Sequence, residues 1–384
     1  MSREKIVLIL LPFSIIFLCL TMTLFGCSDN TSEFSNFSEV KEELKNYKFG
    51  TYKNLKFICD VPSVDAEKIY EFKIERNTEW TNLETEKEKL RKMVEVFFNI
   101  KIKNTEILSS ELSPHTINYQ RYSIQNSEKK VSGYASLASS HTFILADYDE
   151  LFKTRFQKDA RACLPYINLN ETSVKVTLNG KQIDLQAFVK KAENEIKQCC
   201  SDIINEGEEI KAFDAVKIKS SIDGNEYITL RFSHVIDGIA YNQDGFGGVE
   251  EGITPLPSYI TVEMNDQGSI ASIYNPYYYT ITQKTEVKNI LSLSKASDLL
   301  SKELAPNLTY EIKNVDIRYV NITNTQQTAS VAKPMWCYTL EEYNGGYGEP
   351  YNFFLKKVAF VDALNGDIYI ADALNNSCEV YKKE

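Results

Sequence analysis

Side chains that could carry acid–base, nucleophilic or metal chemistry are few and scattered in this 384-residue chain. Its three histidines, His115, His141 and His234, are far apart, and the H-E-x-x-H zinc motif is missing. The sequence also contains no G-x-S-x-G nucleophile motif, no phosphate-binding P-loop and no C-x-x-C pair. We therefore expect no catalytic residues, no metal ligands and no cofactor.

The spacing S-x-x-K, which is typical of penicillin-recognising enzymes, occurs for example at Ser127–Lys130 and Ser292–Lys295. The K-T-G element that accompanies it in those enzymes is missing. Ser292 is better explained as a helix N-cap, because a serine hydroxyl accepts a hydrogen bond from a backbone N–H of the first helical turn. The pattern therefore favours a structural role for Ser292.

One cysteine stands in a context that predicts covalent chemistry. Leu24-Phe25-Gly26-Cys27 follows an apolar run that begins at Ile6. A small residue directly before the cysteine and a leucine two positions earlier are typical of a bacterial lipoprotein signal. We expect residues 1–26 to be the signal peptide, cleavage to fall between Gly26 and Cys27, and the sulfur of Cys27 to carry lipid.

An uncleaved anchor helix is the alternative, because residues 6–26 are long enough to span a bilayer, which takes about 20 apolar residues. Arg3 and Lys5 would hold the N-terminus inside the cell in either case. Both interpretations place the rest of the chain on the extracytoplasmic face of the cell membrane, attached to it at the N-terminus.

The charge of the chain limits its partners. The formal net charge is −10, and removal of residues 1–26, which carry two basic residues and one acidic residue, makes it one unit more negative. An acidic balance argues against nucleic acid as a partner and against a polybasic contact with anionic lipid. Residues 27–384 are numerous enough for one or two ordinary cores.

Six cysteines follow Cys27, and an even number outside the cell is compatible with disulfides. Their spacing matches no dense disulfide framework, and the adjacent pair in a predicted helix cannot easily bond to each other. We favour buried free thiols and leave disulfides open. The six are Cys59, Cys163, Cys199, Cys200, Cys337 and Cys378.

Hydrophobic periodicity predicts four helices among many strands. Capping residues mark their starts, namely Thr81 with Glu84, Asp147 with Glu150, Asp184 and Ser292. We expect the helices at 84–100, 147–162, 184–203 and 292–304, with Pro165 ending the second. We expect strands at 55–61, 68–75, 119–124, 134–137, 174–178, 212–220, 226–235, 258–264, 269–274, 309–321, 333–342, 358–363 and 368–371. Asn179-Gly180 predicts a tight hairpin turn after the strand at 174–178, and we expect Asp362 and Asp367, which flank the last turn, to serve that turn.

The order of these elements predicts an α+β fold in which helices pack on curled antiparallel sheets. A helix followed by strands occurs twice in the second half, and each copy closes on a similar hairpin, ITVEMNDQGSIASIY and VAFVDALNGDIYIAD. We expect a duplicated helix-plus-sheet unit at 181–285 and 286–384. The remaining segments are a tether at 27–50, within which 39–48 is a short helix or more linker, and an N-terminal α+β domain at 51–180.

The close of the chain resembles a known class of domain. Lys333-Pro334-Met335-Trp336, followed by the segment from Val361 to Ile368, resembles the end of PepSY-type and YycH/YycI-like extracytoplasmic domains. Residues 292–296 and 235–239 resemble other parts of such units, whereas Asn365 stands where Thr is common. The first half is similar to uncharacterised Gram-positive lipoproteins. The resemblance implies noncatalytic modules that bind or restrain proteases, sensor kinases or cell-wall enzymes.

Tyrosine-rich segments suggest where a ligand or partner could bind. A tyrosine offers a large contact area with a polar tip, so clustered loop tyrosines suit a glycan or a peptide, whereas alternating aromatics also suit a sheet core. We expect this chain to bind or regulate an envelope protein, with glycan or peptide binding at the surface as the alternative. The candidate residues are Tyr277, Tyr278, Tyr343, Tyr347 and Tyr351.

Overall fold

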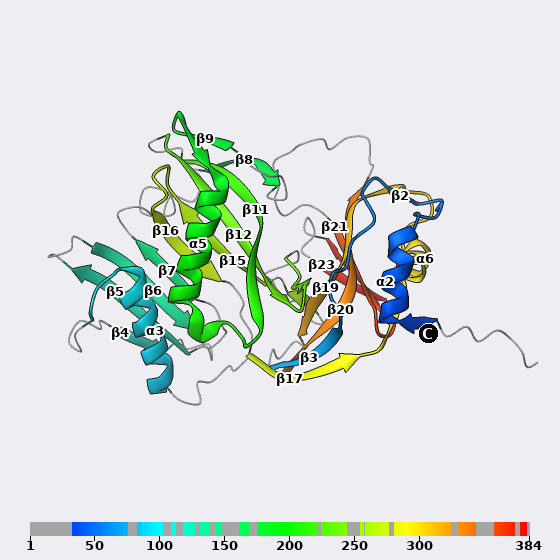
Figure 1. Cartoon of the computed structure of the whole chain (residues 1–384), viewed down its shortest axis with the longest axis horizontal. Coiled ribbons are helices and arrows are strands. Elements are labelled where there is room, and N and C mark those ends of the chain that lie inside the picture. The colour runs from blue at the N-terminus through cyan, green and yellow to red at the C-terminus, as the bar shows by residue number, and fades with distance from the viewer. Residues whose placement is uncertain are drawn as a thin grey trace, which may run out of the picture.

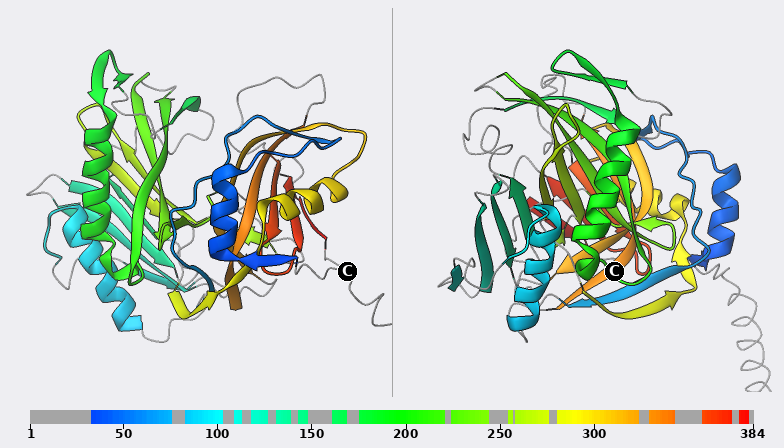
Figure 2. Two further views of the ribbon diagram at one scale, coloured as in Figure 1. Left: turned by 45° about the vertical axis from the view of Figure 1, so that its right-hand side comes forward. Right: turned by 60° about the vertical axis from the view of Figure 1, so that its left-hand side comes forward.

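The computed structural model is a mixed α/β protein that is mostly sheet, with about 50% strand and four α-helices among the residues that it describes. Two lobes lie along the longest axis of the molecule (Figure 1), and each has helices on one side of a sheet (Figure 2). The described residues are 33–75, 83–102, 109–112, 118–126, 131–138, 143–147, 161–168, 175–220, 224–243, 254–256, 258–275, 280–323, 329–342, 357–372 and 377–381.

A ten-stranded, curled sheet forms the first lobe. Its main path runs in the order β4 (Ser109–Leu112), β5 (Asn118–Asn126), β6 (Val131–Ala138), β7 (Phe143–Asp147), β16 (Ile270–Asn275), β15 (Tyr259–Met264), β12 (Glu226–Ile236), β11 (Glu208–Ser220) and β8 (Arg161–Asn168), with β13 (Ile239–Ala240) beside β12. Helices α3 (Leu83–Phe97) and α5 (Leu185–Cys199) pack on it. The short hairpin β9 (Lys175–Leu178) and β10 (Lys181–Asp184) leads into α5, and a 3-10 turn, η1 (Ser201–Ile203), follows that helix.

The second lobe contains a nine-stranded sheet. Its path is β14 (Thr254–Leu256), β19 (Tyr310–Thr323), β20 (Ala329–Glu342), β21 (Lys357–Asp362), β22 (Ile368–Asp372) and β23 (Ser377–Tyr381). β2 (Leu55–Phe57) lies parallel to β19, and β3 (Ile69–Glu75) pairs with both β20 and β17 (Thr280–Val287). Helices α2 (Phe37–Asn46) and α6 (Leu293–Glu303) belong to this lobe, beside a small sheet of β1 (Phe34–Asn36) and β18 (Asn289–Leu291).

The predicted helix starts are confirmed for α5 and α6. The Asp184 carboxylate accepts a hydrogen bond of 3.0 Å from the N–H of Gln186, and the Ser292 hydroxyl accepts one of 3.4 Å from the N–H of Lys295. Both helices turn an apolar stripe toward a sheet, as their periodicity predicts. The stripe of α5 comprises Leu185, Val189, Ala192, Ile196 and Cys199.

Each lobe has its own hydrophobic core. In the first, α3 and α5 pack against the ten-stranded sheet, and residues such as Leu90, Ile196 and Phe232 are fully buried. In the second, α2 and α6 pack against β19, β20 and β21 around Phe72 and Trp336.

The turn between β9 and β10 is formed by Asn179 and Gly180. Both residues have positive φ, of 49° and 79°, which suits the predicted two-residue hairpin turn.

The segment 27–50, which the sequence assigns to a tether, contains β1 and α2. Asn36 and Glu39 form a complete capping box at the start of α2. Phe37, Val40 and Leu44 are buried in the core of the second lobe. The described part of this segment is therefore packed into the fold, and so are β2 and β3, which belong to the second lobe although the sequence placed them in an N-terminal domain.

The helix predicted at 147–162 is wrong at both ends, where the structure has strands. Its middle, 148–160, lies outside the described residues. Asp147 ends β7, and Arg161 and Ala162 belong to β8, so Pro165 lies within a strand. Among the described strands β8 pairs only with β11 and lies at the edge of the sheet, and its register shifts between the pairs of Val216 and Ile218. A proline lacks a donor N–H and is tolerated at an edge and at such a bulge.

Four cysteines have described side chains, and all four are free thiols: Cys59, Cys199, Cys200 and Cys337. Burial raises the pKa of the Cys199 and Cys200 thiols far above its usual range, so both stay protonated and unreactive. Cys163 and Cys378 lie in strands whose side chains are not described.

Among the described helices, none has the length and apolar character needed to cross a membrane.

We expect Phe37→Ala, in the chain from residue 27 onward, to lower the free energy of unfolding by about 3 kcal/mol, because a buried phenyl ring is lost from the core. Glu43→Ala, an exposed change on the same helix, should shift it by less than about 0.5 kcal/mol. Urea denaturation measures both. Equal, small effects would mean that α2 is not part of the folded lobe.

Candidate functional site

The residues predicted to carry lipid or to contact a ligand all lie outside the described residues. The structure therefore tests neither the signal cleavage site nor the tyrosine surface. These residues are Gly26, Cys27, Tyr277, Tyr278, Tyr343, Tyr347 and Tyr351. The described residues build two candidate sites. One is the terminal motif of the second lobe, which comprises residues 333–336 and 361–368. The other is the buried pair of Glu208 and His234 where the two lobes meet.

Asp362, in the terminal motif, binds three neighbours from a buried position. Its Oδ2 accepts a hydrogen bond of 2.9 Å from Nζ of Lys333, and its Oδ1 accepts one of 2.8 Å from the N–H of Leu364. Its backbone carbonyl accepts the N–H of Gly366 at 2.8 Å, which closes the β21–β22 hairpin. Gly366 has a φ of 81°, a left-handed conformation that favours glycine. Asp362 therefore shapes the turn, as the sequence predicts.

The rest of the motif joins that hairpin to the start of α6. The indole Nε1 of Trp336 donates a hydrogen bond of 2.8 Å to the carbonyl of Leu291, which immediately precedes the N-cap Ser292. The N–H of Leu291 donates to the carbonyl of Ala363 at 2.8 Å, and the N–H of Ala363 donates to the carbonyl of Pro334 at 3.0 Å. Because Trp336 is fully buried, these bonds hold helix and sheet together inside the core.

Burial raises the pKa of Asp362, and the nearby Lys333 ammonium only partly offsets this effect. The Asp362 side chain is fully buried and the Lys333 side chain is 21% exposed. The carboxylate is committed to Lys333 and to the hairpin N–H, so the ionised form has partners within the fold. This pair stabilises a turn.

A carboxylate and an imidazole pair at the inner ends of β11 and β12. Oε1 of Glu208 lies 2.5 Å from Nδ1 of His234, and the two side chains are only 3% and 5% exposed. Oε2 of Glu208 accepts hydrogen bonds from the backbone N–H and the side-chain amide of Asn205, at 2.8 and 2.9 Å. Nε2 of His234 lies 3.3 Å from Nδ2 of the buried Asn275.

Two opposing effects set the pKa of Glu208. Burial raises it, but the charge of His234 and the hydrogen bonds from His234 and Asn205 outweigh burial and hold it below its usual range. A carboxylate–imidazole pair of this kind can act in general-base catalysis only if the second ring nitrogen reaches a substrate. Here that nitrogen faces the amide of Asn275, so we assign the group to structure.

The backbone next to His234 leads directly into the second lobe. The carbonyl of His234 accepts the N–H of Tyr241 at 2.7 Å, and Tyr241 forms an isolated parallel bridge with Tyr319 of β19. The rings of Tyr241 and Tyr319 lie 5.6 Å apart, and Phe72 packs edge-on against Tyr319 at 4.8 Å. The polar group therefore lies beside an aromatic cluster that joins the two lobes.

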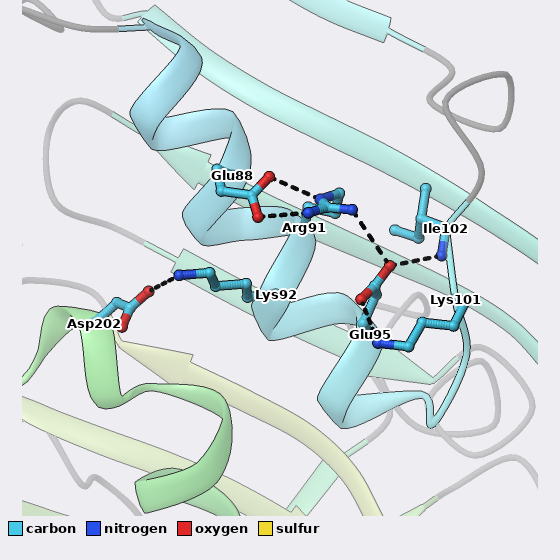
Figure 3. Close-up of polar contacts among 7 residues, drawn as sticks. All are labelled: Glu88, Arg91, Lys92, Glu95, Lys101, Ile102 and Asp202. Atoms are coloured by element: carbon cyan, nitrogen blue, oxygen red, sulfur yellow. Dashed lines mark hydrogen bonds and ion pairs between the residues drawn. The ribbon is translucent and has the colours of Figure 1, made fainter.

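Helix α3 carries a run of charged contacts, shown in Figure 3. Arg91 pairs with Glu88 and Glu95, and Glu95 also accepts bonds from Lys101 at 3.0 Å and from the N–H of Ile102 at 2.9 Å. Burial raises the pKa of Glu95, but the Lys101 and Ile102 bonds and nearby positive charge lower it overall. These contacts fasten the end of α3 to the segment that follows it, and exposed pairs of this kind contribute little to stability.

Across the described part of the chain, no three His, Cys, Asp or Glu residues lie close enough together to hold a metal ion. His234 stands isolated from other histidines in the sequence, and its pairing with Glu208 was not predicted. One signal could have shown it, because a histidine within the apolar strand 226–235 must be hydrogen-bonded if it is buried. The sequence cannot name the partner, since the pairing depends on the β11–β12 register.

No family model matches the chain, and no curated protein matches it. Among solved structures, the chain is similar to the crystal structure of an uncharacterized protein from Eubacterium rectale ATCC 33656. The sequences are 14% identical, the TM-score is 0.49, and the match covers 91% of this chain and 99% of that one.

We expect Glu208→Gln to lower the free energy of unfolding at pH 7 by about 1–3 kcal/mol, because it removes a charged hydrogen-bond acceptor from a buried position. The folded-state pKa of Glu208 is lowered, so its ionised form stabilises the protein above the unfolded-state pKa. That contribution is lost as the pH falls through the folded-state pKa. The difference between wild type and Glu208→Gln should therefore shrink on acidification.

Urea unfolding curves at pH 7 and at progressively lower pH measure this difference. Glu209→Gln, an exposed neighbour on the same strand that pairs only with Lys211 at the surface, is the matched control and should change stability by less than about 0.5 kcal/mol. A constant gap between wild type and Glu208→Gln at every pH would show that the charge of Glu208 contributes nothing.

Proposed function

We propose that this protein is a noncatalytic, extracytoplasmic lipoprotein, held at the cell membrane by lipid on Cys27, that binds or regulates an envelope protein. One observation carries the noncatalytic part. The buried ionisable groups of the described site, Asp362 with Lys333 and Glu208 with His234, are all engaged by neighbours within the fold. Because these buried ionisable groups are bonded within the fold, we assign the function to binding at the protein surface.

The topology supports PepSY-like modules at 181–285 and 286–384. After α5, strands β11, β12, β15 and β16 each pair antiparallel with the next, and after α6 strands β19, β20, β21 and β22 do the same. The third and fourth strands are joined in both units by a glycine turn. Asn265 in one and Asp362 in the other accept backbone N–H groups of that turn through their side chains.

The first half contains a helix and four strands in a similar order. Helix α3 is followed by β4, β5, β6 and β7, each paired antiparallel with the next. Its fourth strand β7 pairs with the fourth strand of the next unit, β16, through Ser272 and Ala146 and three further residue pairs. We therefore extend the proposed repetition to three units, of which two share the ten-stranded sheet. Repetition of one module is common in proteins that present extended binding surfaces.

Lipidation is the part of this proposal that can be tested most directly. In a bacterial host with a lipoprotein-processing pathway, we expect the wild-type chain to enter the detergent phase of a Triton X-114 partition and to begin at a lipidated Cys27. Cys27→Ser should retain residues 1–26 and lose the lipid, because serine has no sulfur to acylate. Intact-protein mass spectrometry distinguishes the two. An unprocessed wild-type chain without lipid would favour the anchor-helix alternative.

The partner is tested by crosslinking in cells, followed by mass spectrometry of the captured proteins. We expect one dominant membrane kinase, protease or cell-wall enzyme, and we expect its capture to fall to background when residues 184–384 are deleted. Capture of only neighbouring lipoproteins at background levels would contradict the regulatory function. Glycan and peptide arrays would then test the alternative, surface binding through the tyrosine-rich segments.

A further inference from the structure

The strand that follows the proposed lipid site is fixed to the second lobe. β1 pairs antiparallel with β18 through Phe34 with Leu291, Ser35 with Ile290, and Asn36 with Asn289. The N–H of Phe37 donates a hydrogen bond of 2.9 Å to the carbonyl of Lys288, and α2 then buries three apolar side chains in the same core. The entry point of the chain is therefore part of the folded lobe.

The distance from this entry point to the bilayer has an upper limit set by the covalent chain. Seven peptide steps separate Cys27 from Phe34. A fully extended chain advances at most about 3.6 Å per residue, so these steps reach about 25 Å at most. A lipid on Cys27, embedded among the acyl chains, therefore keeps β1 and the start of α2 close to the headgroups whatever conformation the intervening residues adopt.

The other lobe lies at the opposite end of the molecule. Figure 1, drawn with the longest axis horizontal, places the ten-stranded sheet with α3 and α5 at one end, and the second sheet with the dark blue β1–α2 segment at the other. The left-hand view in Figure 2 also shows the two lobes apart. The net charge of residues 27–384, which is one unit more negative than the −10 of the whole chain, disfavours close approach of the whole length of the protein to an anionic bilayer.

We propose that the second lobe is membrane-proximal, with its β1–α2 surface toward the lipid headgroups, and that the ten-stranded lobe points away from the bilayer. This inference rests on the proposed lipidation of Cys27. It deepens the proposed function by naming the surface that a partner meets, which is the lobe of α3 and α5. This orientation suits an envelope protein whose docking surface lies farther from the bilayer than the second lobe extends.

The geometry can be measured without natural acylation. The chain from residue 28 onward, preceded by a hexahistidine segment in place of Cys27, is bound to vesicles that contain nickel-chelating lipid and phosphatidylglycerol. p-Azidophenylalanine replaces either Glu42 on α2 or Lys190 on α5, both exposed helix positions, and the azide is coupled to a donor dye. Energy transfer to an acceptor dye on the lipid headgroups reports the height of each position.

We expect transfer efficiency to be several-fold higher from position 42 than from position 190. A flexible Gly-Ser spacer of about 20 residues after Ser28 should abolish most of this difference, because a coil of that length spans about 25 Å on average and lets the protein rotate freely above the bilayer. Equal efficiencies from the two positions with the short tether, or a higher efficiency from position 190, would overturn the proposed orientation.

The same two positions are used for photocrosslinking in cells that express the lipidated chain. Position 190 should capture the protein partner and position 42 should capture lipid, and capture of the partner from position 42 alone would overturn the assignment of the docking lobe. Failure of acylation at Cys27 in the partition assay would instead reject the proposed function. The vesicle result is independent of acylation, so the two failures are distinguishable.

Discussion

A buried carboxylate beside a buried imidazole must be compensated inside the protein, and the meeting of the two lobes depends on this constraint. Glu208 and His234 come from neighbouring strands, and Asn205 and Asn275 complete their hydrogen bonds. Removal of the Glu208 carboxylate would leave buried donors of His234 and Asn205 without their acceptor, which costs about 1–3 kcal/mol. The pair therefore fixes the ends of β11 and β12 where the chain turns toward Tyr319 and the second lobe.

Much of the fold could be predicted where the controlling interactions are local. Helices α5 and α6 were predicted because a capping side chain and an apolar stripe lie within one short segment. Asn179 and Gly180 predicted a tight turn because few other residues adopt positive φ without strain. The four strands after each of these helices were also predicted, because each alternates or is bounded by turn residues.

The remaining structure depends on contacts that no local pattern encodes. β7 pairs with β16 although more than a hundred residues separate them, so the ten-stranded sheet could not be foreseen. Helix α2 was ambiguous because its charged face dominates its composition, yet Asn36 and the spacing of Phe37, Val40 and Leu44 carried the signal. Of the site, the turn role of Asp362 was predicted, whereas its bond to Lys333 and the Glu208–His234 pair required the register of the strands.

Because β1 is paired with β18, the proposed lipid anchor would restrain the second lobe as a whole. A lipid on Cys27 would transmit its restraint to β1, which three residue pairs join to β18, and β18 runs directly into the capped start of α6. Trp336 and Ala363 bind the same point from the sheet side through Leu291. The restraint therefore reaches the central strands of the second lobe through hydrogen-bonded structure. Because a short connection confines the lobe to a thin layer above the bilayer, it raises the local concentration for membrane-bound partners without any new contact.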